Sequence, residues 1–424
     1  MNKERLLEVL RSEMAPALGV TEPAAIALAA AKAYQSIGGN LEAVELTLDP
    51  GIFKNAYSCA VPGTGDKGIE IAAILGVLAG EPEAELEVLK DIREEDVRKA
   101  KSLRDKDIVQ INIKEGISSI FVEAVVVTDK GTARVIIKDL HANIVHVEVN
   151  GKVVYTKNNK EEMDDNSSDY NLPAIDMEEI LNLIENLSFE EIRFTMEAVK
   201  KNKELAESGK DGEGMKVGYG FSKLMKEKML ADDLAGQAKM LTAYAVDARM
   251  GGVPLPAMSF CGSGDHGIIA TLPLVAVAER ENFSQEKLAK SIIISYIITL
   301  YLKNLTGKLS AYCGCAVAAR TGAAAGVAYL LGGDKEQIIG AINNMAGNIT
   351  GMICDGGNFG CALKATTAAG AAVEAALLAN NNYYLENKNG IVGKDLKETL
   401  DNMALIATPG MEKTNDTIID ILQK

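Results

Sequence analysis

The chain has 424 residues, of which 47% are hydrophobic and 24% charged, an ordinary composition for a globular protein long enough for two domains. Its formal net charge of −15 argues against nucleic acid and anionic membranes as partners, because both bind basic surfaces. A small-molecule partner is the better expectation. The 39 glycines, the absence of tryptophan and the many alanines are together typical of helices that pack closely through small side chains.

The N-terminus begins an amphipathic helix and lacks the uninterrupted apolar core of a signal or transit peptide. The longest apolar run, residues 292–302, is bounded by Lys290 and Lys303 and is too short to span a bilayer, so it predicts a buried helix. We therefore expect a cytoplasmic protein. Its six cysteines are then thiols, metal ligands or catalysts and not structural disulfides.

Residues 1–160 are expected to form an α+β domain. The residue types predict two successive helices from residue 3 to about residue 36, separated by residues 19–23, and further helices at 69–78 and 83–103. Thr21 is expected to be the N-cap of the helix at 24–33. Alternating patterns predict strands at 41–48, 108–113, 119–128, 132–138, 143–148 and 152–156. The last two strands are joined by Asn150-Gly151, a dipeptide that strongly favours a hairpin turn.

Residues 157–172 carry almost no side chains that could be buried, so they mark the predicted domain boundary. Beyond them, helical periodicity continues to the C-terminus, and residues 173–424 are expected to form an all-α domain. Its predicted breaks are at 209–220, 251–267, 332–333, 354–360 and 387–393. The predicted fold class is an α+β N-terminal domain followed by an all-α helical domain.

Four of the six cysteines lie between residues 313 and 361. Cys313 and Cys315 would point about 200° apart in a helix, so only one of them could face a shared centre. Cys354 and Cys361 flank a glycine-rich segment that cannot sustain a helix, and we expect a loop there. Three thiolates would leave one iron of a cubane cluster open as a Lewis acid. Buried thiols without a metal are about equally compatible with the spacing, whereas a zinc site lacks its usual close cysteine pairs.

Two loops of the same pattern precede apolar helices, one at Gly63-Thr64-Gly65 and one at Gly262-Ser263-Gly264. Both match the dinucleotide motif G-x-G-x-x-G, but neither begins a βαβ unit. We favour an anion nest, in which backbone N–H groups at a helix N-terminus bind a carboxylate. Tight turns with close backbone packing are the structural alternative.

Arg249 lies at the predicted end of a helix, and its guanidinium is suited to hold a carboxylate by two hydrogen bonds. A surface ion pair with Asp247 is the alternative. Of the three histidines, His266 lies in the second glycine loop and is the best titratable candidate for a pocket. His141 and His146 flank the start of a strand on opposite faces, so at most one of them faces a given site.

The segments 309–313 and 351–356, together with Cys361, resemble the iron–sulfur L-serine dehydratase α-chain family, especially its L-cysteine desulfidase branch. The resemblance extends over nearly the whole chain through 62–65, 143–146, 247–252 and 262–264. It implies an oxygen-sensitive lyase whose [4Fe-4S] cluster is held by Cys313, Cys354 and Cys361. Such enzymes perform β-elimination on a small amino acid without pyridoxal phosphate, releasing ammonia and a 2-oxo acid.

The motifs and the resemblance together indicate a set of site residues. The candidate proton-transfer groups are Glu22, His146 and His266. The candidate substrate contacts are Thr21, Gly63, Thr64, Gly65, Asn143, Arg249, Ser263 and Gly264. The desulfidase branch has Gly-Cys-Thr-Glu-Pro near its N-terminus, where this chain has Val20 in place of the cysteine. Valine cannot transfer a proton, so another group is the base, or the substrate differs, or the chain is not a desulfidase.

The expected function is a cluster-dependent ammonia-lyase acting on L-cysteine or L-serine. Small-residue helices and a sizeable apolar content are compatible with a homodimer. The alternative is a non-catalytic iron–sulfur or thiol protein that senses iron or redox state. A pyridoxal-phosphate enzyme is less favoured, because no lysine is singled out for a Schiff base.

Overall fold

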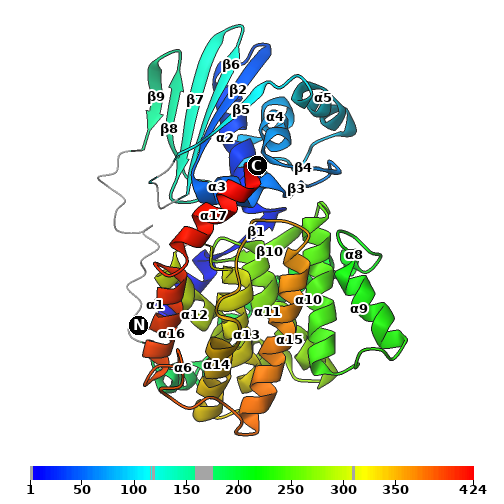
Figure 1. The fold of residues 1–424 in the computed structure, drawn as a ribbon, viewed down its shortest axis with the longest axis vertical. Helices are drawn as coiled ribbons and strands as arrows, with labels where there is room; N and C mark the ends of the chain where they lie inside the picture. The colour runs from blue at the N-terminus through cyan, green and yellow to red at the C-terminus, as the bar shows by residue number, and fades with distance from the viewer. Residues whose placement is uncertain (1–2, 115, 117–119, 158–174, 308–310) are drawn as a thin grey trace.

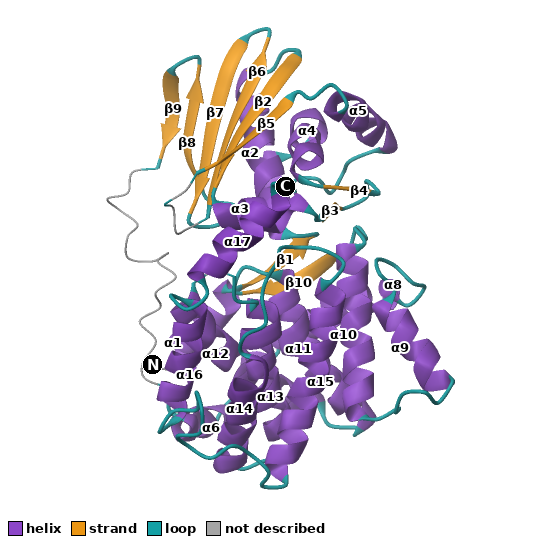
Figure 2. Cartoon of the chain, in the orientation of Figure 1, coloured by secondary structure: helices purple, strands orange, loops and turns teal. Residues whose placement is uncertain are grey.

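The structure, a computed structural model, describes residues 3–114, 116, 120–157, 175–307 and 311–424. Figure 1 shows a region with a large sheet, formed by the first part of the chain, lying next to a bundle of helices. In Figure 2 the long strands all belong to the first region, and the second is almost wholly helical. The predicted α+β region followed by a helical region is confirmed.

The N-terminal region is built on a six-stranded sheet with the strand order β5-β2-β6-β7-β8-β9. β2 and β5 are parallel, and the other neighbouring pairs are antiparallel. The turn between β8 and β9 has positive φ angles at Asn150 and Gly151, which confirms the predicted hairpin. The strands are β2 (Leu41–Leu48), β5 (Val109–Ile113), β6 (Phe121–Thr128), β7 (Gly131–Lys138), β8 (Ile144–Val149) and β9 (Lys152–Thr156).

The alanine-rich helix α2 (Thr21–Ile37) packs on β6 and β7 of this sheet. It also packs against α4 (Ile69–Ala79), where a Cβ at Gly76 would lie 2.3 Å from the carbonyl oxygen of Ala27. The predicted charged helix at 83–103 is divided into a 3-10 helix and an α-helix. The remaining elements are α3 (Pro50–Tyr57), β3 (Ala60–Val61), β4 (Asp66–Lys67), η1 (Pro82–Glu87) and α5 (Glu94–Arg104).

The helical region is centred on α11 (Gly264–Arg280) and α12 (Gln285–Thr306), which are buried along most of their length. By length and composition, α12 and α15 (Cys361–Asn380) could cross a membrane, but 83% and 61% of their apolar windows are buried in the fold. They are core helices here, which confirms the burial predicted for 292–302. The other helices are α6 (Met177–Glu185), α7 (Phe189–Ile192), α8 (Thr195–Gly209), α9 (Val217–Lys226), α10 (Leu234–Met250), η2 (Cys315–Ala319), α13 (Arg320–Leu330), α14 (Lys335–Ile349) and α16 (Leu396–Ala407).

The chain crosses between the two regions near both of its ends. α1 (Lys3–Ser12) packs in the helical core, and β1 (Met14–Leu18) pairs with β10 (Pro256–Phe260). These two short strands lack clear alternation, and the sequence pattern does not predict them. The first predicted helix, expected to continue to the break at 19–23, ends at Ser12, and β1 follows in its place. At the other end, α17 (Glu412–Leu422) packs against α3. The division into domains 1–160 and 173–424 stays a prediction, because most of the boundary segment lies outside the described residues.

Replacing Gly76 with alanine is expected to destabilise the fold by about 1–3 kcal/mol, because the added methyl group would collide with the backbone of α2. Gly220→Ala in α9 is the matched control, since no described atom lies within 4 Å of the added Cβ. It should stabilise the protein by about 0.5–1 kcal/mol through helix propensity. Thermal unfolding followed by circular dichroism measures both, and equal melting temperatures for the two variants would contradict the close contact.

Candidate active site

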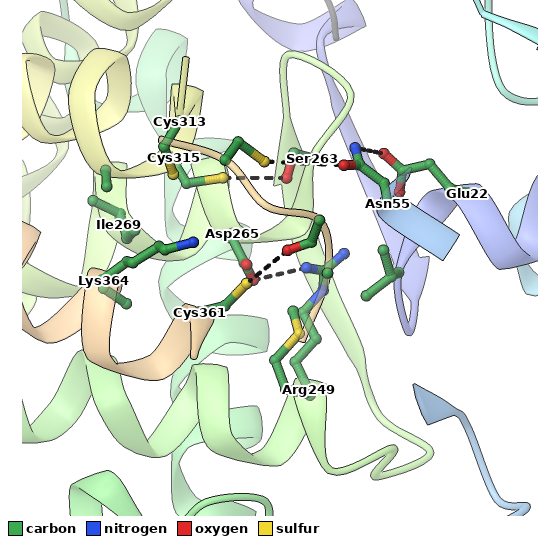
Figure 3. A pocket seen from close by; sticks show the side chains of 17 residues that line it. Glu22, Asn55, Arg249, Ser263, Asp265, Ile269, Cys313, Cys315, Cys361 and Lys364 are labelled. Carbon is green, nitrogen blue, oxygen red and sulfur yellow. Dashed lines mark hydrogen bonds and ion pairs between the residues drawn. The ribbon is translucent and has the colours of Figure 1, made fainter. Parts of the chain in front are cut away.

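A cavity that is partly open to solvent lies where the N-terminal and helical regions meet, and its empty space, together with the adjoining solvent, is about 550 Å³. Figure 3 shows side chains from both regions around this space. The N-terminal region contributes Val20, Glu22 and Asn55. The helical region contributes Arg249, Met250, Ser263, Asp265, Ile269, Cys313, Cys315, Ala316, Cys354, Gly356, Gly357, Cys361, Lys364 and Ala365.

Two segments bring four cysteines to the cavity wall. Cys354 lies in a non-helical loop, and Cys361 is the first residue of α15, so the loop predicted between them is confirmed. Cys313 and Cys315 both line the cavity, although a regular helix would point them apart. They share the cavity because Cys313 precedes the helix and Cys315 begins the π-helical turn η2.

The two cysteine segments are joined by backbone hydrogen bonds. The amide of Cys313 donates to the carbonyl of Met352 at 3.0 Å, and the amide of Cys354 donates to the carbonyl of Ala311 at 2.7 Å. Residues 309 and 310 of the motif lie outside the described residues. A hydrogen bond with Cys315, together with burial, raises the pKa of Cys313 to about 12, so this thiol is protonated in the metal-free protein.

The arrangement of the thiols bears on the kind of metal centre they could hold. Among the described residues, no three His, Cys, Asp or Glu side chains are close enough together to hold a single metal ion. Cys313, Cys354 and Cys361 nevertheless line one cavity that is much larger than an ion. Zinc requires four ligands at about 2.0–2.3 Å, whereas thiols spread over a cavity wall fit a multi-atom iron–sulfur cluster.

Glu22 is a buried carboxylate on the opposite wall (Figure 3). Its Oε1 accepts a hydrogen bond from Asn55 Nδ2 at 2.8 Å, and its Oε2 accepts one from the Thr21 hydroxyl at 3.0 Å. Asn55 Oδ1 in turn accepts a long hydrogen bond of 3.9 Å from Cys354 Sγ. The predicted N-cap role of Thr21 is wrong: Val20 occupies that position, and Thr21 orients Glu22 instead.

His141 is the histidine closest to Glu22. Its Nε2 lies 3.8 Å from Glu22 Oε1, and both side chains are buried. His146 lies on β8, where Nδ1 hydrogen-bonds to the Thr156 hydroxyl at 3.0 Å, and it does not line the cavity. Asn143 also lies away from the cavity wall, with Nδ2 donating to the carbonyl of Lys138. The structure therefore places His141, and not His146, beside the candidate base.

His266 is buried behind the cysteine segment. Its Nδ1 carries the proton, because both of its partners are carbonyl oxygens, those of Phe260 at 3.1 Å and Cys261 at 3.3 Å. Its Nε2 lies against Gly314, where a Cβ would approach it to 2.5 Å. Burial lowers the pKa of His266 to about 3, so it stays neutral at physiological pH. We therefore do not assign proton transfer to His266.

Arg249 lines the cavity, but its guanidinium hydrogen-bonds to other protein groups. Nη1 donates to Asp265 Oδ1 at 2.7 Å, while Nε and Nη2 donate to the carbonyl of Gly19 at 3.1 and 2.8 Å. A Cβ at Gly264 would lie 2.6 Å from Nε, so glycine allows α11 to begin against this side chain. Ser263 also lines the cavity, with its hydroxyl 3.7 Å from Cys315 Sγ.

The first glycine loop forms the turn between β3 and β4 and is not part of the cavity wall. The amide of Gly63 donates to the carbonyl of Gly252 at 3.0 Å, and the Thr64 hydroxyl donates to the carbonyl of Val61 at 2.7 Å. Gly63 and Gly65 both have positive φ angles. This geometry matches the tight turn that was the alternative to an anion nest.

Three polar or charged residues of the cavity wall have no role in the sequence prediction. Lys364 follows Cys361 by one helical turn and forms an ion pair with Asp355, so helical spacing could have identified it. Asp265 follows Gly264 directly and could have been found as the acidic residue at a helix start. Asn55 is 299 residues from Cys354, and no local pattern connects the two.

Comparison with known proteins finds relatives along the whole chain. A family model described as serine dehydratase alpha chain matches residues 83–420. A UPF0597 protein of Clostridium botulinum (strain Hall) is 46% identical over 430 residues, covering 100% of this chain and 99% of the relative. UPF0597 proteins of Clostridium tetani and Caldanaerobacter subterraneus are each 38% identical, cover 100% of this chain, and are themselves covered to 99% and 100%.

Breaking the buried pair by Arg249→Met is expected to destabilise the fold by about 3–5 kcal/mol, because Asp265 is left as an unpaired buried charge. The double variant Arg249→Met with Asp265→Leu should be more stable than Arg249→Met alone, since no uncompensated charge remains. Thermal unfolding of Arg249→Met, Asp265→Leu and the double variant, each compared with the wild type, measures the coupling free energy between the two side chains. Additive losses in the double variant would show that the two side chains do not depend on each other.

Proposed function

The chain belongs to the serine dehydratase alpha-chain family, and from this membership we propose that it is an iron–sulfur lyase acting on a small amino acid. One observation carries the proposal: Cys313, Cys354 and Cys361, the cysteines that match the family motif, line one cavity opposite the buried carboxylate of Glu22. The proposed cofactor is a [4Fe-4S] cluster held by these three thiolates. The proposed substrate is L-cysteine or L-serine, and membership of the desulfidase branch stays part of the proposal.

When bound, such a cluster would supply a Lewis-acidic iron that has no protein ligand. Glu22 is the group that we assign to remove the α-proton, because it is the carboxylate on the wall facing the cysteines. Asn55 and Thr21 hold its two oxygen atoms in place. His141, 3.8 Å from Glu22 Oε1, is the neighbouring group that can accept the proton next.

The α-carboxylate of the substrate needs a positive charge on the cavity wall. Lys364 supplies one, since its ammonium points into the cavity in Figure 3 while its ion pair with Asp355 keeps it in position. We assign Arg249 a supporting role, because Asp265 and the carbonyl of Gly19 occupy its donors. Ser263 is the remaining candidate contact on this wall.

Loss of the α-proton and the β-substituent would convert the substrate to 2-aminoacrylate. This enamine tautomerises to an imine, which water hydrolyses to pyruvate and ammonia. The elimination step also releases sulfide from L-cysteine, or from L-serine a water molecule that the hydrolysis of the imine balances. Val20 lines the cavity where the desulfidase branch has a cysteine, so no thiol at this position can exchange a proton with the substrate.

Val20 is also the observation that favours a second candidate function, a non-catalytic iron–sulfur or thiol protein that senses iron or redox state. The two candidates differ in their response to amino acids. A lyase should show a change in its visible spectrum with L-serine or L-cysteine, whereas a sensor should respond to neither. A cytoplasmic location and a homodimer stay predictions from the sequence.

Cys354→Ser is expected to abolish both the cluster and turnover, because it removes one of three proposed ligands. Iron and acid-labile sulfide assays on protein purified without oxygen should give about four irons per wild-type chain and far fewer in the variant. Cys315→Ser is the matched control, since Cys315 lines the same cavity but is not in the family's ligand set, and it should retain the iron. Full activity in Cys354→Ser would contradict the proposed function.

Glu22→Gln is expected to lower turnover by about a hundred- to ten-thousand-fold, because the amide cannot take the α-proton. Its iron content and spectral response to substrate should stay at wild-type levels. Pyruvate formation measures the loss, and Glu45→Gln, at an exposed position on β2, is the control for a change of charge alone. Undiminished turnover in Glu22→Gln would assign the base elsewhere.

A further inference from the structure

Arg320 is the largest fully buried side chain of the described structure and begins α13. Its Nε, Nη1 and Nη2 atoms hydrogen-bond to no described residue. Arg249, the other buried arginine among the described residues, donates instead to Asp265 and the carbonyl of Gly19. Burial lowers the pKa of Arg320 to about 10, so the guanidinium remains charged at neutral pH.

A buried charge without a partner is strongly unfavourable, and proteins normally pair such a group. The nearby groups whose anionic forms would interact favourably with the charge of Arg320 are Tyr312 and Cys313, which lie just before η2. A protonated phenol and a protonated thiol are neutral, so neither provides the missing negative charge. Cys313 would become an anion on binding iron, because the thiolate is the form that ligates a metal.

We propose that Arg320 is the built-in counter-charge for the iron–sulfur centre at Cys313, an inference that rests on the proposed function. Three thiolates carry more negative charge than the oxidised four-iron core carries positive charge, so the bound group is a net anion. Charges that are buried attract each other with little screening by salt or water. The guanidinium therefore stabilises the loaded protein and destabilises the metal-free protein.

Lys303 supports the same charge arrangement. Its ammonium donates to the carbonyl of Gly307 at 2.6 Å, and a Cβ at Gly314 would approach Nζ to 3.2 Å. Its charge would interact favourably with the thiolate forms of four cysteines, Cys261, Cys315, Cys354 and Cys313. Arg320 and Lys303 are thus two buried basic side chains whose charges both favour a negative charge on Cys313.

Arg320→Met tests the inference, because it removes the charge and keeps a long, flexible side chain. Thermal unfolding of the wild type and the variant is measured metal-free and after anaerobic reconstitution with iron and sulfide. Metal-free Arg320→Met should melt several degrees above the metal-free wild type. The rise in melting temperature on reconstitution should be smaller in Arg320→Met than in the wild type, since binding the anion gains less.

Two further variants control for charge and for burial. Arg320→Lys keeps the positive charge and should behave much more like the wild type than Arg320→Met does. Thr242→Val removes a buried neutral hydroxyl that has no partner among the described residues, so it should shift both states equally. A readout independent of turnover is the reduction potential of the cluster, which should become more negative when the positive charge is lost.

The outcomes separate this inference from the proposed function. An equal rise in melting temperature on reconstitution for wild type and Arg320→Met would overturn the counter-charge role and leave the iron–sulfur lyase in place. Failure of metal-free Arg320→Met to fold would also overturn it, since the inference requires that the unpaired guanidinium destabilises the metal-free protein. A wild type that takes up no iron would overturn both.

Discussion

The guanidinium of Arg249 is the contact on which the geometry of the cavity depends. It lies at the end of α10 in the helical region and donates to the carbonyl of Gly19, just before α2 of the N-terminal region. Its ion pair with Asp265 fixes the start of α11 at the same point. Charge-assisted hydrogen bonds are directional, so they set the distance and orientation of the two walls more closely than apolar packing would.

Glycines allow these groups to approach the backbone of neighbouring elements. Gly264 lies against the guanidinium of Arg249, and Gly314 lies against His266. At Gly357 a Cβ would lie 2.1 Å from Cys59 Sγ, so the cysteine-bearing loop is pressed directly onto the N-terminal region. The high glycine content of the chain is thus used in part where the site is assembled, and not only in turns.

Local pattern predicted most of the fold, including the hairpin at Asn150-Gly151, the buried helix over 292–302 and the loop between Cys354 and Cys361. It did not predict β1 and β10, because two short strands that pair across more than two hundred residues carry no alternation to identify them. For the same reason Asn55 was not found, and His141 could not be preferred over His146. Contacts between distant segments are formed by tertiary packing, and spacing along the chain does not record them.

The return of the C-terminus to the N-terminal region has a consequence for how the protein is made. α17 packs on α3, where Asn415 Oδ1 accepts a hydrogen bond from Lys54 Nζ at 2.9 Å. α3 also carries Asn55, whose carbonyl accepts from the amide of Gly357 in the cysteine-bearing loop. The ribosome must therefore synthesise the chain through α17 before this part of the fold is complete, so the wall of the cavity that carries Asn55 reaches its final packing only after nearly all of these residues have been translated.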